Sequence, residues 1–99
     1  MSEARLDRQA PGRFALVGEL SFVSVPGLVE LGASLFEDGD EARLDLSQVE
    51  RSDSAGLALL VSWVRTARQQ GKQLNFEQIP SQLLGMARVS GVDHILSLA

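Results

Sequence analysis

The sequence predicts a small α/β domain with a mixed β-sheet, in which an N-terminal hairpin is followed by parallel strands packed with about four helices. Short segments with the strand period recur between longer apolar stretches with helical spacing. Strands that alternate with helices pair in parallel, because the helix carries the chain back to the same end of the sheet. With 99 residues there is room for one core, so residues 1–99 are expected to form a single domain.

The first residues predict an antiparallel hairpin. Pro11 followed by Gly12 suits the two central positions of a type II turn, because proline presets φ and glycine accepts a positive φ. The segments 5–8 and 13–17 flank this turn. We expect them to be the two strands of the hairpin.

The middle of the chain predicts a helical segment, a strand and a longer helix. The helical segment begins near Ser24 and Pro26 and ends at Asp38-Gly39. Its apolar residues recur at helical spacing: Leu28, Leu31, Leu35 and Phe36. A strand period follows, with these apolar residues at alternate positions: Ala42, Leu44 and Leu46. The apolar run after residue 53 then predicts the longer helix, which Gly71 ends.

The last third of the chain predicts a short strand and a third helix. Leu74 and Phe76 indicate the strand. Ser81 is placed to cap the helix, and Gly91 is its natural C-terminal stop. The period of residues 92–96 fits a final strand or a short helix equally well.

The stretch RSDSAGL joins the alternating strand to the longer helix. Asp53 is a good N-cap, because its carboxylate accepts from free backbone N–H groups at the positive end of the helix dipole. Ser54, Ala55 and Gly56 then occupy the first turn. In one interpretation these small residues only let the chain bend close to its neighbours. In the other, Ser54 is presented to a ligand or partner, because such contacts are usually made at the carboxyl ends of parallel strands.

The longer helix also offers a candidate contact surface. At about 3.6 residues per turn, one face collects the residues that should pack on the sheet: Leu57, Leu60, Val61, Val64 and Ala67. Leu59 falls roughly opposite this face, and Trp63 lies at its edge. Either Leu59 is an incidental surface leucine and Trp63 a boundary core residue, or the two form a docking stripe, since tryptophan is enriched among interface anchors.

Composition and motifs argue against several classes of function. The formal charge of −4 gives no electrostatic reason to bind nucleic acid or an anionic lipid surface. The longest uncharged stretch is too short for direct insertion into a bilayer. The lack of cysteine and of an apolar signal core fits a cytoplasmic address. No glycine-rich phosphate loop ends in a lysine, and metal ligands of suitable spacing are missing, so no cofactor or metal is expected.

The sequence also predicts a protein that is not an enzyme. His94 is the sole histidine, so a triad of Ser54, His94 and Asp53 can be written down. The acid and the nucleophile are adjacent in sequence, however, and no oxyanion site is recognisable. His94 is better explained as a surface or boundary residue near the C-terminus.

Several motifs along nearly the whole chain fit one family when taken in order. They are Gly18-Glu19-Leu20, Leu44-Asp45-Leu46-Ser47, Asp53-Ser54-Ala55-Gly56-Leu57, Gln70-Gly71 at the end of the longer helix, and Ser90-Gly91-Val92. This ordered set resembles the STAS domain, the fold of bacterial anti-sigma-factor antagonists. Ser21 stands where the family usually has an aspartate after the first motif.

The resemblance implies two possible functions. The run DSAGLALLV is similar to that of MlaB, the STAS subunit of the Mla phospholipid-transport ABC complex. This similarity implies that the chain is an accessory subunit that binds a cytoplasmic ATPase (MlaF-like), which forms a complex with a membrane permease. The chain would then lie at the inner membrane through its partner and would support outer-membrane lipid asymmetry. The residues expected at that contact are Asp53, Ser54, Ala55, Gly56, Leu59 and Trp63.

The second possibility is an anti-sigma-factor antagonist. In antagonists, the serine after the aspartate is the phosphorylation site that controls binding to an anti-sigma kinase, and Ser54 occupies that position. Antagonists typically read Asp-Ser-Ser/Thr-Gly-Leu, whereas this chain has Ala55 in the third place. The helix run is more similar to the transporter subunit, so the sequence favours the first possibility.

Overall fold

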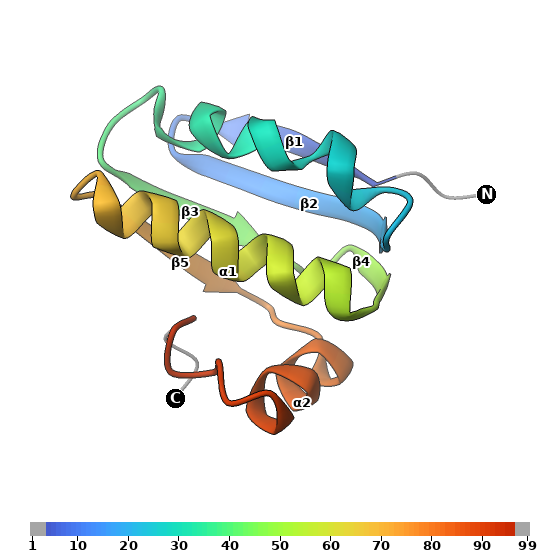
Figure 1. Ribbon diagram of the computed structural model, residues 1–99. Helices are drawn as coiled ribbons and strands as arrows, with labels where there is room; N and C mark the ends of the chain where they lie inside the picture. The colour runs from blue at the N-terminus through green and yellow to red at the C-terminus, as the bar shows by residue number, and fades with distance from the viewer. Residues whose placement is uncertain (1–3, 97–99) are drawn as a thin grey trace.

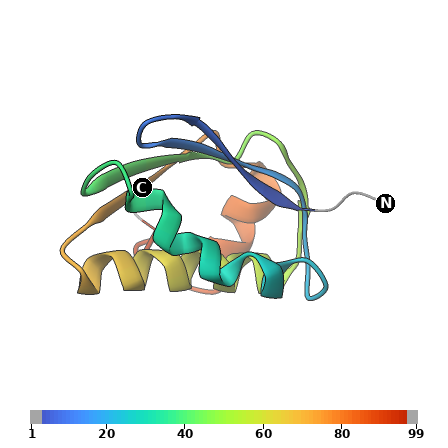
Figure 2. The same cartoon turned by 90° about the horizontal axis from the view of Figure 1, so that it is seen from above.

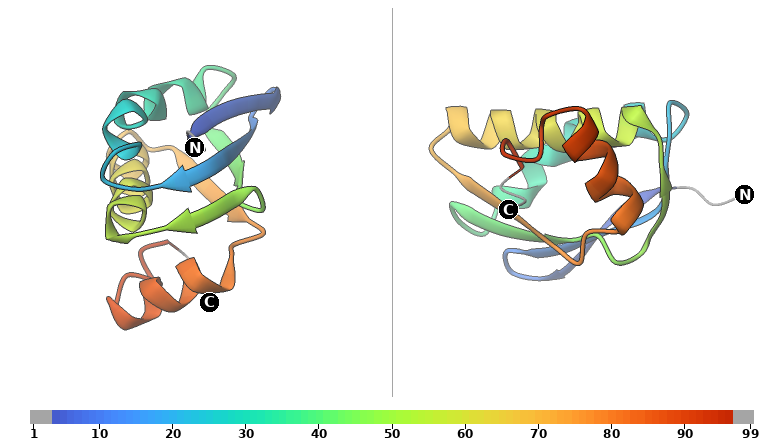
Figure 3. Two further views of the ribbon diagram at one scale, coloured as in Figure 1. Left: turned by 90° about the vertical axis from the view of Figure 1, so that its right-hand side faces the viewer. Right: turned by 90° about the horizontal axis from the view of Figure 1, so that it is seen from below.

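The computed structural model describes residues 4–96 and has a mixed α/β fold, as the sequence predicts. The strands are β1 (Arg5–Ala10), β2 (Arg13–Leu20), β3 (Glu41–Asp45), β4 (Val49–Ser52) and β5 (Gln73–Glu77). The helical elements are the 3-10 segments η1 (Val25–Gly27) and η2 (Val29–Phe36) and the α-helices α1 (Ser54–Gln69) and α2 (Ser81–Val89). Figure 1 and Figure 2 show α1 and the 3-10 segments on one face of the sheet. Helix α2 lies beside β4 (Figure 3).

Strand β2 is the centre of the sheet. It pairs antiparallel with β1 through the tight turn at Pro11-Gly12, where Gly12 has a φ of 72°. On its other side it pairs in parallel with β3 through its first half and with β4 through its second half, so β3 and β4 follow one another along the same edge. Strand β5 pairs in parallel with β3. The predicted hairpin and the predicted parallel pairing are therefore both confirmed.

The core lies between the sheet and the helical layer. The largest fully buried side chains are all leucines, which come from the strands, η2, the α-helices and the position after β3: Leu16, Leu20, Leu35, Leu44, Leu46, Leu59, Leu60 and Leu83. Burying one such side chain contributes about 1.5–3 kcal/mol. Burial of these side chains therefore stabilises the packing of α1 on the sheet.

The sequence does not predict strand β4. Only Val49 and Ser52, at its two ends, are buried, so the strand shows no alternation. At the end of this strand, the backbone of Ser52 forms hydrogen bonds with the side chain of Gln82 on α2. The Ser52 N–H donates to Gln82 Oε1 at 3.3 Å, and Gln82 Nε2 donates to the Ser52 carbonyl at 2.9 Å. The Gln82 amide thus takes the place that a neighbouring strand would occupy.

The predicted helix over residues 24–39 is wrong in type. It forms the two 3-10 segments, with hydrogen bonds that run three residues back, such as Leu28 N–H to the Val25 carbonyl at 2.8 Å. Gly27 and Gly32 interrupt this segment, and each glycine costs an α-helix about 1 kcal/mol. The segment ends at Phe36, before the predicted stop.

Two expectations for the last third also need correction. Ser81 does not cap α2: it is the first helical residue, after Pro80, and the helix has no side-chain cap. Gly91 ends the helix as predicted, with a φ of 73°. Residues 93–96 form turns, and neither the strand nor the short helix is present over 92–96.

Candidate functional site

Asp53 joins the start of α1 to the loop that follows β2. Its Oδ1 accepts a hydrogen bond from Ala55 N–H at 2.8 Å, which caps the helix as the sequence predicts. Its Oδ2 accepts from Phe22 N–H at 3.3 Å, and its own N–H donates to the Leu20 carbonyl at 3.0 Å. The carboxylate therefore binds two segments at once, with one hydrogen bond to each of its oxygens.

Ser54 is the first residue of α1 and is exposed. Because Asp53 makes the cap, the helix does not need the Ser54 hydroxyl in order to begin. Ser54 lines a shallow groove of about 470 Å³ that runs along α1, with Ser90 and Val92 from the segment after α2 also in its lining. Leu57, Ala58 and Val61 provide apolar lining, and Arg65 is a charged lining residue.

The loop beside Asp53 presents two apolar side chains to solvent. Phe22 is 72% exposed and Val23 is 89% exposed. Two serines hold the loop in shape: Ser21 Oγ accepts from Val23 N–H at 3.2 Å, and Ser24 Oγ accepts from Ser21 N–H at 2.9 Å. Sequence reasoning missed this feature. The available signal was an apolar pair enclosed by two serines just before the predicted helical segment.

Ala55 and Gly56 are less accessible than Ser54. Ala55 is half-buried, and Gly56 is buried. A Cβ at Gly56 would lie 2.7 Å from the Leu20 Cβ and would overlap the Ser52 Oγ. Gly56 is therefore required for the close approach of α1 to the sheet.

The expected docking stripe of Leu59 and Trp63 is wrong. Leu59 is 2% exposed and Trp63 is 4% exposed, so both belong to the core. The helical wheel assumed one packing face, whereas α1 is covered by the sheet and also by η1 and η2 (Figure 2). Its buried arc is consequently wider than the sequence alone predicts. The exposed side of α1 instead carries Ala58, Ser62 and Arg65.

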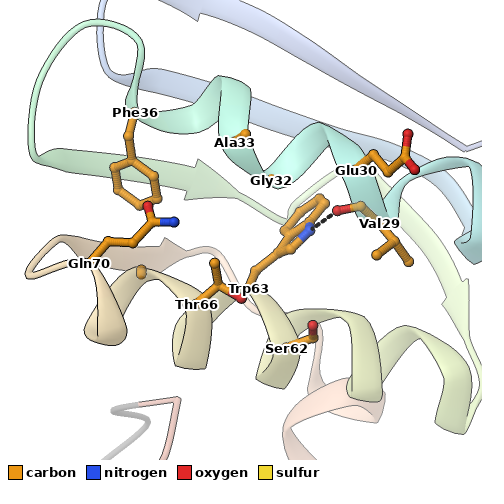
Figure 4. Close-up of a pocket in the computed structure, with 10 residues that line it drawn as sticks. Val29, Glu30, Gly32, Ala33, Phe36, Ser62, Trp63, Thr66 and Gln70 are labelled. Atoms are coloured by element: carbon orange, nitrogen blue, oxygen red, sulfur yellow. Dashed lines mark hydrogen bonds between the residues drawn. The ribbon is translucent and has the colours of Figure 1, made fainter.

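A second pocket, of about 200 Å³, lies between η2 and α1. Figure 4 shows Phe36 on η2 near Gln70, the residue that follows α1, and the Trp63 ring bonded to the Val29 carbonyl. A Cβ at Gly32 would lie 2.6 Å from Trp63 Cδ1, so η2 approaches the indole ring closely. This contact fixes the 3-10 layer on α1, and the pocket beside it has room for only a small group.

Other chemistry-bearing features do not gather at this site. His94 is exposed in the C-terminal turn. Within residues 4–96 no group of three or more histidine, cysteine, aspartate or glutamate side chains is placed to hold a metal ion. Over the same part of the chain, no helix has both the length and the apolar character needed to cross a membrane.

Comparisons with known proteins agree with this architecture. A family model described as "Mlab, STAS domain" matches residues 5–97. The anti-sigma-B factor antagonist of Bacillus subtilis (strain 168) is 29% identical over 84 residues, which cover 85% of this chain and 77% of that protein.

Two solved structures share the fold. The unphosphorylated form of the anti-sigma factor antagonist SpoIIAA superposes with a TM-score of 0.65 at 12% identity, covering 86% of this chain and 81% of that one. The phosphorylated form of SpoIIAA, a Bacillus cell fate determinant, superposes with a TM-score of 0.68 at 13% identity, covering 92% of this chain and 86% of that one.

Proposed function

This chain belongs to the STAS-domain family, and on that premise we propose that it is a non-enzymatic subunit that binds the ATPase of an Mla-type phospholipid-transport ABC complex. It would act in the cytoplasm, at the inner membrane through its partner, and would support the assembly and activity of the transporter in outer-membrane lipid asymmetry. The match of the MlaB-type family model over residues 5–97 favours this branch of the family.

One observation carries the proposal: the separation of roles between Asp53 and Ser54. Asp53 caps α1 and holds the Phe22 loop. Ser54 is thereby left exposed as a lining residue of the groove, in the position that the family resemblance gives to the partner contact. A surface of this kind, with the exposed Phe22 and Val23 beside the Ser54 hydroxyl, suits the recognition of a folded protein.

Co-purification tests the proposal. The chain is expressed with the ATPase and permease of an Mla-type transporter from its source organism, and the membrane complex is isolated through a tag on the permease. We expect this chain to be retained in the complex and the ATPase rate of the complex to fall when it is absent. A complex that assembles and hydrolyses ATP equally well without this chain would contradict the proposal.

The second candidate is an anti-sigma-factor antagonist regulated by phosphorylation of Ser54. It is favoured by the curated relative at 29% identity, which is an antagonist. The exposure of Ser54 is consistent with access by a kinase. Its test is incubation with ATP and the kinase encoded nearest to this chain, followed by intact mass measurement. A gain of one phosphate that is lost in Ser54→Ala would establish this function instead.

A further inference from the structure

The two α-helices carry only positive side-chain charge in an acidic protein. The chain has a formal net charge of −4, with 13 acidic residues against 9 lysines and arginines. Helices α1 and α2 nevertheless contain no aspartate or glutamate, and their charged residues are Arg65, Arg68 and Arg88. The charge carried by these two helices therefore has the opposite sign to that of the chain as a whole.

Arg65 is the charged residue of these helices that lines the groove. None of the four ion pairs formed within residues 4–96 uses it. Arg68 is different, because its Nη2 donates to the Ile95 carbonyl at 2.7 Å. Arg65 is thus the guanidinium that is available to a carboxylate lying in the groove.

The shape of the groove selects the kind of segment that fits it. It follows α1 from Ser54 to Arg65, which at 1.5 Å per residue is about 16 Å, or three helical turns. Leu57, Ala58 and Val61 give it an apolar floor, and Ser90 and Val92, which follow α2, also line it. An amphipathic helix packs its apolar stripe against such a surface, whereas an added strand would need unpaired backbone groups that α1 does not offer.

We propose that this groove binds an amphipathic helix of the partner and that an acidic side chain of that helix pairs with Arg65. The inference rests on the proposed function, because it describes how the partner occupies the surface beside Ser54. A second copy of this chain is a poor occupant. A symmetric contact between two α1 helices would bring two arginine-bearing surfaces together with no carboxylate on either helix.

The test combines photo-crosslinking with charge reversal in the full-length chain. The photo-crosslinker benzoylphenylalanine replaces Ala58 in the groove, and a control chain carries it at Gln9, which is exposed on the edge strand β1. Chains are crosslinked in their source cells, and the captured peptide is identified by mass spectrometry. We expect Ala58 to capture an acidic, amphipathic helical segment of the ATPase, and Gln9 not to capture it.

Charge variants then test the pairing in binding measurements with the captured partner. Arg65→Glu is expected to weaken binding about tenfold, and Arg65→Gln to weaken it less and to reduce its salt dependence. The matched control is Arg43→Glu on β3, where the exposed Arg43 pairs with Glu77 at 3.6 Å. It should leave binding unchanged.

The outcomes separate this inference from the proposed function. Capture of an acidic helix from a kinase or another protein, with the same response to Arg65→Glu, would support helix binding in the groove. It would overturn the transporter assignment. If the ATPase co-purifies but is not captured from Ala58, or if Arg65→Glu binds it fully, the proposed helix contact in the groove is overturned. The proposed function is then retained. Capture of this chain itself, or of a basic or non-helical segment, would also overturn the helix contact.

Discussion

The indole Nε1 of Trp63 donates a hydrogen bond to the Val29 carbonyl at 3.1 Å, and this bond ties α1 to the first residue of η2. The same ring lies against Gly32, where a Cβ would approach Trp63 Cδ1 to 2.6 Å. One buried side chain therefore both packs and orients the 3-10 layer. Its loss should affect folding before it affects any partner.

Replacement of Trp63 should lower the free energy of unfolding in two steps. Trp63→Phe keeps an aromatic ring but leaves the Val29 carbonyl without its donor, and should cost about 1–3 kcal/mol. Trp63→Ala also leaves a cavity, and should cost about 3–5 kcal/mol. Urea denaturation measures both. Ser62→Ala, at the exposed neighbouring position, should stay within about 0.5 kcal/mol. A Trp63→Phe protein as stable as the wild type would show that the bond contributes nothing.

Two adjacent positions of α1 should respond in opposite ways to the same charge. Leu59→Asp places a carboxylate in the core and should unfold the protein, because the cost is comparable with the whole stability of a small domain. Ala58→Asp places it on the exposed side, and should leave the circular dichroism spectrum unchanged while weakening partner binding. If Leu59→Asp folds normally, α1 is rotated relative to the arrangement described here.

Glycine replacements should separate close packing from helix propensity. Gly56→Ala drives a Cβ against Leu20 and Ser52, and should lower stability by about 1–3 kcal/mol or more. Gly85→Ala, in the interior of α2, meets no atom within 4 Å and should raise stability by about 0.4–1 kcal/mol. Thermal melts distinguish the two. Equal effects at both sites would contradict the close approach at Gly56.

Removal of the Asp53 carboxylate should loosen two segments together. Asp53→Ala is expected to cost about 0.5–2 kcal/mol through loss of the cap. It should also accelerate hydrogen exchange at the Phe22 amide, which the same carboxylate holds. Ser34→Ala, which removes a hydroxyl bonded only to a nearby carbonyl of its own segment, serves as a control for exchange at Phe22. Unchanged exchange at Phe22 in Asp53→Ala would refute the link.

Substitution of Ser54 should act on binding and not on folding. Ser54→Ala should change stability by less than about 0.5 kcal/mol, because Asp53 carries the cap. Loss of an interfacial hydrogen bond should weaken partner binding by about 0.5–1.5 kcal/mol. Ser54→Glu should weaken it much more, since the charge must be desolvated against the partner. Melting curves and pull-downs with the ATPase measure the two effects. A Ser54→Glu protein with normal binding would place Ser54 outside the interface.

Local sequence signals predicted the parts of the fold that local chemistry controls. Gly12 in the hairpin turn and Gly91 after α2 have the positive φ that glycine accepts, and Asp53 caps α1 through its own carboxylate. Each of these outcomes depends on neighbouring residues only. The resemblance of the ordered motifs then identified the family, although most of the motifs are short.

The parts that could not be predicted depend on contacts between distant segments. Leu59 is buried because a second layer covers α1, and nothing in the helix sequence reveals that layer. Strand β4 exists because β2 continues past the end of β3 and still has an open edge. The Phe22 loop joins the site because Asp53, 31 positions away in the chain, holds its amide.

The pairing of Gln82 with Ser52 has a consequence for the behaviour of the protein at high concentration. A strand edge with free N–H and C=O groups can recruit a strand from another molecule and start aggregation. At Ser52, the last residue of β4, both groups are bonded to a side-chain amide, which carries no backbone that a further strand could extend. Helix α2 therefore blocks the addition of another strand at this end of β4. Any condition that detaches α2 would expose unpaired backbone groups of β4 next to the start of α1, and these groups could pair with another molecule.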